Sequence, residues 1–411
     1  MNYELPGEIL KSRDLPLEAE PRVLYFATNS LPHSVAGYSI RTQSLLEALV
    51  SNGIEARCCT RLGYPLSVGR FAFRQVEEIN GVRYSRMLPL WMPLKRASQL
   101  KLAVKMLVKE AERSRVTVIH TTTDYTNAYI ASRAADILGI PWVYEIRGER
   151  HNTWLSVQSP SGSPTAAGYY PYAVGKEHDA IENAAGLAVL TVGKFESIRE
   201  KYPDKKICLI PNGISTKLKK PGRDSSPIAV GRTKSHRLLV GSISSLVPYE
   251  GFETLIQALP YLPDSVEAIL VGEGVHRKKL EKEARDLAIA DRVTFVGSQD
   301  YSQIDTWYEK IDIFVVPRLD KEVTRNIAPI KHLRAMQLGK PVVASDLPAL
   351  VEATGGLACY FPPGDAKALS EKILGLCRNE IDYEYAEIQD WIKTRTWNSN
   401  ACKLAQMYRS E

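Results

Sequence analysis

Positively charged side chains and glycines follow several apolar segments of the sequence. Arg318 comes directly after the apolar run IDIFVVP, and Lys331 stands near the predicted start of the next helix. Gly37 stands at the predicted start of another helix, where backbone N–H groups can approach a phosphate. Arg318 or Lys331 alone is more typical of a solvated charge, and Gly37 alone is equally typical of a plain helix cap. Together, Arg318 and Lys331 predict a clamp for a diphosphate.

The signatures of several common chemistries are missing. The sequence has no GxGxxG after a predicted strand, no GxxxxGK[ST] loop, and no HExxH, GxSxG or paired CxxC motif. It also has no DxD motif, the usual acidic anchor of a metal-bound nucleotide diphosphate. We therefore expect no metal site, and we expect amide groups and cations to neutralise any bound diphosphate.

Short apolar segments alternate with helical patterns along the chain, which predicts an α/β fold with parallel sheets covered on both faces. Helical periodicity extends over residues 39–51, 252–259, 276–287 and 330–338. The predicted strands are 22–28, 116–121, 141–146, 186–192, 207–211, 237–243, 266–272, 292–296, 311–317 and 340–344.

The strand series occurs twice, on either side of a stretch rich in Lys, Pro, Gly and Ser. This organisation predicts two Rossmann-like domains and their flanking segments. We expect an N-terminal extension that is mobile or draped over the surface, and last helices that can cross back to the first domain. The predicted segments are the extension 1–20, a first domain 21–213, a linker 214–236, a second domain 237–382 and C-terminal helices 383–411.

Composition and charge limit the classes of partner. The 411 residues carry a formal net charge of +6, and they lack the aromatic-studded basic strands or recognition motif of a nucleic-acid-binding protein. The segment from Lys95 to Arg115 predicts an amphipathic basic helix, with Lys101, Lys105 and Lys109 on one face. It is either a solvated surface helix or a dock for an anionic membrane surface or a lipid-phosphate acceptor. The first twenty residues have no apolar signal core, so we expect a cytoplasmic location.

A series of motifs resembles glycosyltransferase family 4, the retaining GT-B glycosyltransferases, from about Arg22 to Gly356. The motifs, in chain order, are SLPHSVAGYSIRTQSLLEAL, GIPWVYEIRGER, ICLIPNGI, LLVGSISSLVPYEGFETLIQAL, ILVGEG, RVTFVGSQ and VPRLDKEVTRNIAPIKHLRAMQLGKPVVASDLPALVE. The resemblance implies two domains with parallel sheets facing a cleft, and a nucleotide-diphosphate sugar bound mainly by the second domain. It also implies transfer with retention of configuration, without a cofactor, to a cell-envelope glycan, lipid-linked or polysaccharide acceptor.

The resemblance, together with position after predicted strands, assigns candidate site residues. Arg147 and His120 are catalytic candidates, although a lone histidine is more often structural, and Arg147 has Glu145 and Glu149 as alternative partners. Acceptor-binding candidates are His33, Tyr38, Arg41 and Glu149. Donor-binding candidates are Gly37, Ser242, Gly272, Glu273, Gly297, Ser298, Arg318, Asn326, Lys331 and Arg334.

The chain departs from the family pattern at several of these positions. Ser242 and Glu250 replace an arginine and a lysine of many members, and Arg318 and Lys331 would compensate. Asn326 and Arg334 replace two glutamates, and an arginine cannot accept a hydrogen bond from a ribose hydroxyl. These departures leave a second hypothesis open, a catalytically degenerate GT-B subunit that serves as a partner or scaffold for an active transferase. Another GT-B enzyme, such as a nucleotide-sugar epimerase, is a third.

Overall fold

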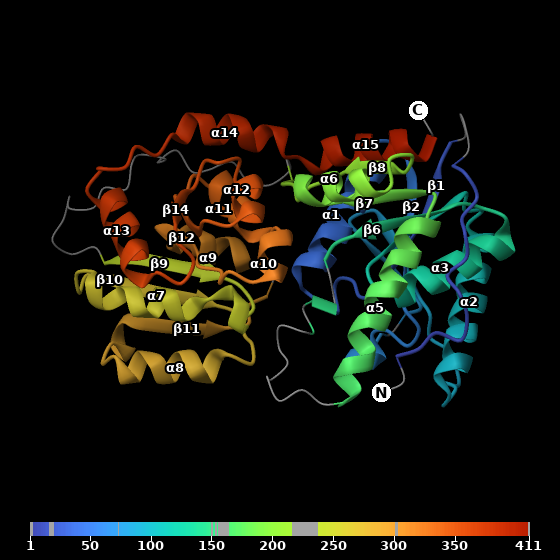
Figure 1. The fold of residues 1–411 in the computed structure, drawn as a ribbon, viewed down its shortest axis with the longest axis horizontal. Coiled ribbons are helices and arrows are strands. Elements are labelled where there is room, and N and C mark those ends of the chain that lie inside the picture. Colours follow the sequence, from blue (N-terminus) through green and yellow to red (C-terminus); the bar gives the residue numbers. More distant parts are fainter. Residues whose placement is uncertain are drawn as a thin grey trace. The chain divides into compact units, whose positions relative to one another are not determined.

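The computed structural model of the chain describes residues 3–15, 20–72, 74–148, 151–152, 154, 164–215, 237–300 and 303–409 (Figure 1). The chain forms two compact units, each described here by itself. Unit 1 comprises Met1–Pro211 and Trp397–Glu411, and unit 2 comprises Asn212–Thr396. The predicted linker lies almost entirely outside the described residues, because only its first two positions, 214 and 215, are among them.

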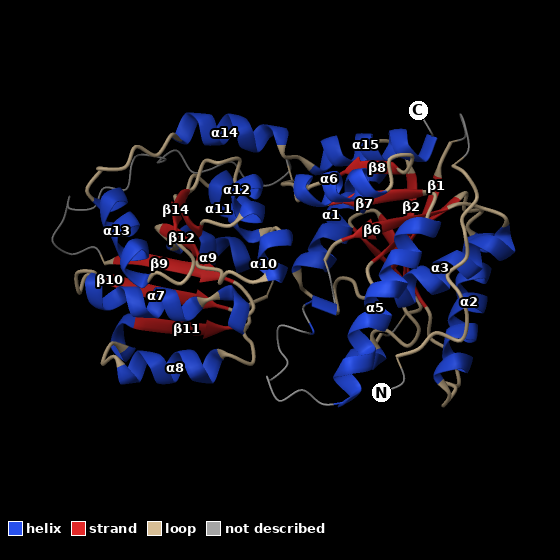
Figure 2. Ribbon diagram, in the orientation of Figure 1, coloured by secondary structure: helices blue, strands red, loops and turns tan. Residues whose placement is uncertain are grey.

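The described part of unit 1 contains an eight-stranded sheet of order β3-β4-β2-β1-β5-β6-β7-β8. Figure 2 colours the strands red and the helices blue. Neighbouring strands are parallel, as predicted, except that β3 adds an antiparallel edge strand to β4. The strands are β1 (Arg22–Ala27), β2 (Glu55–Thr60), β3 (Val76–Ile79), β4 (Val82–Arg86), β5 (Val118–Thr122), β6 (Trp142–Ile146), β7 (Gly186–Val189) and β8 (Lys206–Leu209).

The antiparallel edge of this sheet has a local cause. Asn80 and Gly81 connect β3 to β4 with φ angles of 49° and 80°. A two-residue turn with two positive φ angles matches the right-handed twist of a hairpin, and Asn-Gly is its preferred sequence. The sequence therefore folds back at this point and adds an antiparallel edge strand to the parallel sheet.

Helices connect the strands of unit 1. Asp124 caps the start of α3 by accepting a hydrogen bond from the Thr126 amide at 3.0 Å, and Gly139 ends that helix with φ of 67°. The predicted basic helix is present as α2. The helical segments are α1 (Gly37–Ser51), η1 (Leu66–Val68), α2 (Arg96–Arg113), α3 (Tyr125–Leu138), α5 (Pro164–Asn183), α6 (Val192–Lys201) and α15 (Trp397–Arg409).

The N-terminal segment is packed onto unit 1. Ile9 and Leu15 are buried, and Ile9 belongs to the apolar core around β1, β5 and β6. The Ser12 hydroxyl accepts a hydrogen bond from the Trp142 amide at 2.9 Å, and the Trp142 indole donates to the Leu10 carbonyl at 3.2 Å. Of the two predicted behaviours of this extension, the described residues show draping over the surface.

Unit 2 contains, within its described residues, a six-stranded sheet of order β11-β10-β9-β12-β13-β14. All of its strand pairs are parallel. The order along the sheet reverses between β9 and β12, which defines the switch point where ligands of such sheets bind. The strands are β9 (Leu238–Ile243), β10 (Val266–Val271), β11 (Val293–Gly297), β12 (Ile313–Val316), β13 (Val342–Ser345) and β14 (Cys359–Phe361).

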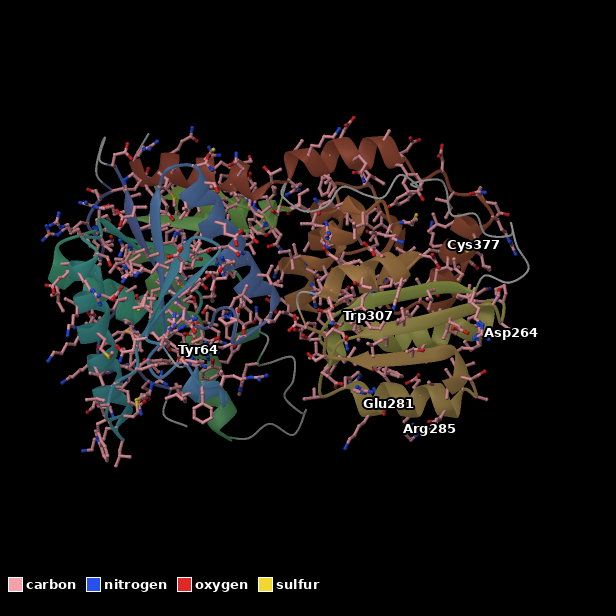
Figure 3. The ribbon with its side chains drawn as sticks, turned by 180° about the vertical axis from the view of Figure 1, so that it is seen from behind. Tyr64, Asp264, Glu281, Arg285, Trp307 and Cys377 are labelled. Atoms are coloured by element: carbon pink, nitrogen blue, oxygen red, sulfur yellow. The ribbon has the colours of Figure 1, made fainter. Side chains whose placement is uncertain are left out.

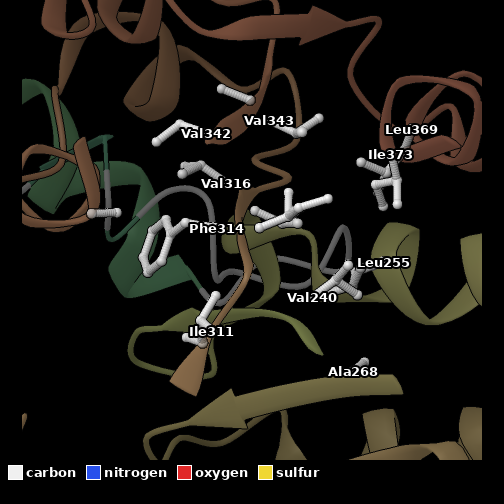
Figure 4. Close-up of a cluster of buried hydrophobic side chains, with 14 of the residues drawn as sticks. Val240, Leu255, Ala268, Ile311, Phe314, Val316, Val342, Val343, Leu369 and Ile373 are labelled. Carbon is white, nitrogen blue, oxygen red and sulfur yellow. The ribbon is translucent and has the colours of Figure 1, made fainter. Parts of the chain in front are cut away.

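The core of unit 2 explains why its strands are apolar throughout. Phe314 and Val316 of β12 and Val240 of β9 pack with residues of the covering helices, among them Leu255 and Leu369 (Figure 4). A strand covered on both faces buries consecutive side chains. The helical segments are η2 (Pro248–Glu250), α7 (Phe252–Ala258), η3 (Leu259–Tyr261), α8 (Arg277–Asp286), η4 (Ala290–Arg292), α9 (Ile304–Lys310), α10 (Glu322–Asn326), α11 (Lys331–Gln337), α12 (Pro348–Ala353), α13 (Ala366–Cys377) and α14 (Tyr385–Thr394).

Every strand predicted from the sequence is present, although several are shorter than predicted. Strands β2, β3, β4 and β14 were not predicted. Of the two C-terminal helices, α14 lies in unit 2 and α15 lies in unit 1. The position of α15 matters for the site in unit 1, because two of its side chains contact the buried charges described below.

Candidate functional site

A cluster of polar side chains occupies the switch point of the sheet in unit 2. Ser244 follows β9, and Arg318 follows the neighbouring strand β12. Arg318 donates from Nη2 to Glu250 Oε1 at 2.7 Å and from Nη1 to the Ile327 carbonyl at 2.7 Å. Lys331, the first residue of α11, donates from Nζ to Ser244 Oγ at 2.7 Å. The structure thus brings the two predicted cations, Arg318 and Lys331, into one group, the switch-point cluster of Ser244, Glu250, Arg318 and Lys331.

This cluster carries more positive than negative charge. Burial raises the pKa of Glu250, but Arg318 and Lys331 outweigh it and hold that pKa below its usual value. Burial lowers the pKa of Lys331 to about 8, with Glu250 opposing and Arg318 adding to the shift. One carboxylate faces two cations, so an anion at this edge would complete the charge balance. Because Arg318 is already engaged by Glu250, Lys331 is the cation better placed to meet a diphosphate.

Glycines allow the loops at this edge to approach one another closely. A Cβ added to Gly272, which has φ of 141°, would lie 1.8 Å from the Ser244 carbonyl oxygen. A Cβ added to Gly274 would lie 2.1 Å from the Leu246 carbonyl oxygen. The loop after β10 therefore rests directly on the loop after β9, which fixes the backbone that carries Ser244. This close packing explains why residue 272 is a glycine, which the sequence alone did not reveal.

The other predicted donor-binding residues lie at several positions of unit 2. Ser242 is buried in β9, Glu273 is exposed and pairs with Arg277, and Ser298 is exposed after β11. The Gly297 carbonyl accepts a hydrogen bond from the Gly272 amide at 2.9 Å. These residues follow or end neighbouring parallel strands, so they share the carboxyl edge of the sheet. Their contact with a donor stays a prediction.

Arg334 and Asn326, the two departures from the family pattern, have different surroundings. Arg334 holds the Asp305 carboxylate in two hydrogen bonds, Nε–Oδ1 at 2.9 Å and Nη2–Oδ2 at 2.7 Å, and it donates to Gln337 Oε1 at 2.7 Å. Asn326 is exposed at the end of α10. This bidentate ion pair joins α11 to α9, so Arg334 has a structural role. Its contact with the donor stays a prediction.

Unit 1 contains a second charge cluster, which is buried. Glu145 of β6 accepts hydrogen bonds from Arg41 Nε at 2.7 Å, from Arg147 Nη2 at 3.0 Å and from the Tyr25 hydroxyl. Burial raises the pKa of Glu145, but Arg147 and Arg41 outweigh it and hold that pKa well below its usual value. The ion pair of Arg147 with Glu145, one of the alternatives left open by the sequence, is therefore confirmed.

His120 and the helix α15 complete this cluster. The His120 ring stacks on Tyr25 at a centroid distance of 4.6 Å, and its Nδ1 lies 2.5 Å from the Tyr408 hydroxyl. Burial lowers the pKa of His120, and the neighbouring Glu145 opposes part of that shift. Trp397 lies against the Arg41 guanidinium at 5.3 Å. Both Trp397 and Tyr408 belong to α15, so the C-terminal helix is fixed to unit 1 through these contacts.

Two residues predicted to contact a substrate are buried in unit 1. Arg41 was predicted to contact an acceptor and His120 to act in catalysis, but their exposed fractions are 2% and 0%. Arg41 also donates to the Ile210 carbonyl at 2.6 Å, so its donors face protein groups. A side chain enclosed in this way cannot reach a substrate without a rearrangement. In this conformation both side chains contact protein groups, and their predicted contact with a substrate stays a prediction.

The start of α1 lies next to this buried cluster. Arg147 Nη1 donates to the Tyr38 carbonyl at 2.8 Å and to Thr42 Oγ1 at 2.7 Å. The first turn of α1, which contains Gly37, has no side-chain cap and no acidic residue. Arg147 thus positions the end of a helix that is suited to an anion, and its own predicted contact with a substrate stays a prediction.

The remaining acceptor candidates lie near the same end of α1. Tyr38 is 45% exposed and accepts a hydrogen bond from Asn29. His33 lies 3.4 Å from the Glu77 carboxylate and edge-on to Tyr64. Glu149 lies outside the described residues. Among the residues that the structure describes, no three His, Cys, Asp or Glu side chains form a group that could hold a metal ion.

Comparison with known proteins identifies the family. The model described as "Glycosyl transferase 4-like domain" matches residues 36–213, and the model described as "Glycosyl transferases group 1" matches residues 237–379. Between them the two models cover most of the chain. The fold and these matches define a GT-B glycosyltransferase. The chain belongs to the family 4 type of these enzymes.

Individual relatives are distant. An uncharacterised glycosyltransferase, MJ1607 of Methanocaldococcus jannaschii, is 24% identical over 78% of this chain and 79% of its own length. A GDP-mannose-dependent phosphatidylinositol monomannoside mannosyltransferase of Mycobacterium tuberculosis is 27% identical over 49% of this chain and 55% of its own. The match thus spans about half of that enzyme. The structure of Anabaena HepE with UDP and glucose has a TM-score of 0.68 at 18% identity, covering 95% of this chain and all of that one.

Proposed function

We propose that this glycosyltransferase moves a sugar from a nucleoside-diphosphate donor to a cell-envelope glycan, lipid-linked or polysaccharide acceptor, with retention of configuration. The donor diphosphate binds at the carboxyl edge of the sheet in unit 2. The observation that carries this proposal is the switch-point cluster, in which Lys331 supplies positive charge that no carboxylate of the cluster balances. The relatives support the donor and acceptor classes, since one is GDP-mannose-dependent with a phosphatidylinositol mannoside as acceptor, and another was solved with UDP.

The chemistry of the proposed step is mainly electrostatic. The bond between the anomeric carbon and the diphosphate oxygen breaks, and an acceptor hydroxyl oxygen bonds to that carbon on the same face. Negative charge develops on the departing diphosphate, which accepts the proton of the hydroxyl. Lys331 stabilises that charge, and backbone amides of the loops after β9 and β10 add donors. Glu250 orients Arg318, which donates to the Ile327 carbonyl and so holds the segment before α11 that carries Lys331. Lys331 and the backbone amides meet the phosphate charge directly, so the proposed reaction does not depend on a metal ion.

A nucleotide panel tests this proposal. UDP, GDP and ADP are added to the full chain, with and without EDTA, and the melting temperature is recorded. A nucleotide at 100 times its dissociation constant is expected to stabilise the folded chain by about 2.7 kcal/mol, with EDTA making no difference. If no nucleotide shifts the melting temperature and no nucleotide sugar is hydrolysed, the chain is a non-catalytic GT-B subunit. In that case the bidentate Arg334–Asp305 pair would mark a lost ribose site.

The pKa of Lys331 predicts how nucleotide binding depends on pH. The free ammonium loses its proton around pH 8, whereas a bound diphosphate would hold that proton to higher pH. Because only the charged form attracts the diphosphate, affinity is expected to fall by up to about tenfold per pH unit above about pH 8. Calorimetric titration with nucleoside diphosphate between pH 7 and pH 9.5 measures this slope.

The matched variant for this measurement is Lys331→Arg, since a guanidinium stays charged throughout that range. Binding by the arginine variant is expected to be independent of pH above 8. A slope that persists unchanged in Lys331→Arg would assign the titration to another group and would remove Lys331 from the donor site.

A further inference from the structure

Two loops of unit 1 present large apolar side chains to solvent. Phe71, in the loop after β2, is 78% exposed, and Trp91 and Leu94, in the loop after β4, are 79% and 94% exposed. Single exposed apolar residues are common, but a contiguous group of this size usually marks an interaction site. We call this group the apolar loop pair, and its members are Leu66, Val68, Phe71, Leu90, Trp91 and Leu94.

The two loops lie side by side. The Gly63 amide donates to the Met87 carbonyl at 2.8 Å, and a Cβ added to Gly63 would lie 2.8 Å from the Met92 methyl carbon. Tyr64, labelled in Figure 3, is fully buried and lies 3.1 Å from Ser34 Oγ, which anchors the first loop. Gln99 of α2 donates to the Pro93 carbonyl at 2.7 Å and anchors the second. The exposed side chains therefore stand on a backbone held by buried and hydrogen-bonded residues.

The apolar loop pair lies at the same edge of the sheet as the candidate acceptor residues near the start of α1. Strands β1, β2 and β4 are parallel neighbours, so the loops that follow them leave the same edge of the sheet. The loop after β1 leads to Gly37 and the uncapped start of α1. The apolar loop pair and the start of α1 therefore share the carboxyl edge of this sheet.

The charged residues of the two loops and of most of α2 are all positive. No Asp or Glu occurs in residues 56–76 or in residues 79–109, which include both loops and most of α2. Exposed cations of these segments are Arg70, Arg74, Lys95, Lys101, Lys105 and Lys109. The buried face of α2 is apolar, with Leu100, Val104 and Leu107 packed into unit 1. Cations beside exposed Trp and Leu match an anionic lipid surface, because apolar side chains enter the interface while Lys and Arg meet anionic head groups.

We propose that the apolar loop pair inserts into the interfacial region of an anionic membrane while the lysines of α2 contact lipid head groups. This inference rests on the proposed function for the class of acceptor. Of the three acceptor classes, a membrane at this edge selects the lipid-linked one, whose sugar end would lie near the start of α1. Within the described residues, no helix is both long and apolar enough to cross a bilayer.

The test uses the full chain with vesicles of phosphatidylcholine containing about 30% phosphatidylglycerol and with vesicles of phosphatidylcholine alone. Co-sedimentation measures the fraction bound. The wild-type chain is expected to bind the anionic vesicles and to release them at high salt. The loop variant Leu90→Ser, Trp91→Ser, Leu94→Ser is expected to bind at least tenfold more weakly. The helix variant Lys101→Ser, Lys105→Ser, Lys109→Ser is expected to lose about fivefold per lysine.

Control variants distinguish binding through this surface from nonspecific hydrophobic adsorption to vesicles. The control variant Ile137→Ser, Tyr261→Ser, Val275→Ser removes three exposed apolar side chains elsewhere and is expected to bind as the wild type does. The Trp91→Phe variant is expected to keep vesicle binding but to lose the blue shift of tryptophan emission that insertion of Trp91 produces. Because all these side chains are exposed, the melting temperatures should agree within a degree or two.

Three outcomes decide the inference. Loss of binding in the loop variant together with retention in the control variant supports it. Equal binding by both variants overturns it, as does a wild-type dimer that ignores vesicles and dissociates in the loop variant, because the surface would then join two copies of this chain. Nucleotide affinity of the loop variant without vesicles is expected to be unchanged. If the chain binds vesicles but no nucleotide, that result contradicts the proposed function and does not contradict the proposed membrane surface.

Discussion

Replacing Glu145 by glutamine is expected to lower the free energy of unfolding of unit 1 by about 3–5 kcal/mol. Glu145 is fully buried and lies between Arg41 and Arg147. Glutamine has nearly the same shape, so the change leaves two buried guanidinium groups without a counter-charge. Hydrogen–deuterium exchange of peptides from β5, β6 and α15 at increasing urea concentration measures the loss within unit 1.

An exposed ion pair provides the matched control for this prediction. Lys282 and Asp286 on α8 pair at 2.5 Å with side chains that are 69% and 60% exposed. Asp286→Asn is expected to cost less than about 1 kcal/mol, because water replaces the lost interaction. If the two variants lost equal stability, the buried cluster would not be holding unit 1 together.

The same cluster predicts that the stability of unit 1 falls at acidic pH. Because the pKa of Glu145 is lower in the folded chain than in the unfolded one, its contribution to stability is complete above about pH 4.3. That contribution is lost as the pH falls through the depressed value. The Glu145→Gln variant lacks the titrating group, so its stability is expected to change less than that of the wild type over this acid range.

Replacing Lys331 by alanine is expected to weaken binding of nucleoside diphosphate by about tenfold to a hundredfold, because a charge-assisted hydrogen bond contributes about 1.5–3 kcal/mol. The loss is expected with the diphosphate and not with the nucleoside alone, since Lys331 meets phosphate oxygens. Calorimetric titration of both ligands measures it. Lys331 is a better target than Arg318, whose removal would leave Glu250 buried without its partner.

Lys367→Ala is the matched control, since Lys367 is an exposed lysine in the first turn of α13 in the same unit. It is expected to leave nucleotide affinity unchanged. Equal affinity of the wild type and Lys331→Ala for the diphosphate would contradict the proposed role of Lys331.

The sequence predicted those parts of the fold that have local causes. The apolar run that contains β12 and the periodic pattern of α11 were both found, because burial on two faces and helical spacing leave direct patterns. The hairpin of β3 and β4 was missed although Asn80-Gly81 is its signal, because both strands carry many polar residues. Strand β14 has three residues, too few for any periodicity.

Partners of the site residues could not be predicted in the same way. Arg318 was placed at the ligand edge because it follows a strand, but its partner Glu250 stands 68 positions earlier in the sequence. Arg334 pairs with Asp305 across 29 positions, and Tyr408 meets His120 across 288. Such pairs depend on how strands and helices are arranged, and no spacing in the sequence records that. The burial of Arg41 and His120 was missed for the same reason.

The most direct test of the central claim is the pKa of Lys331 itself, followed by nuclear magnetic resonance of the full chain labelled with ¹³C at the lysine ε carbons. The Lys331 signal, assigned by comparison with Lys331→Arg, is titrated with and without nucleoside diphosphate. The account predicts a pKa of about 8 in the free protein and a clear increase when the diphosphate is added, with no increase for the nucleoside. A lysine signal that titrates identically with and without diphosphate would contradict it.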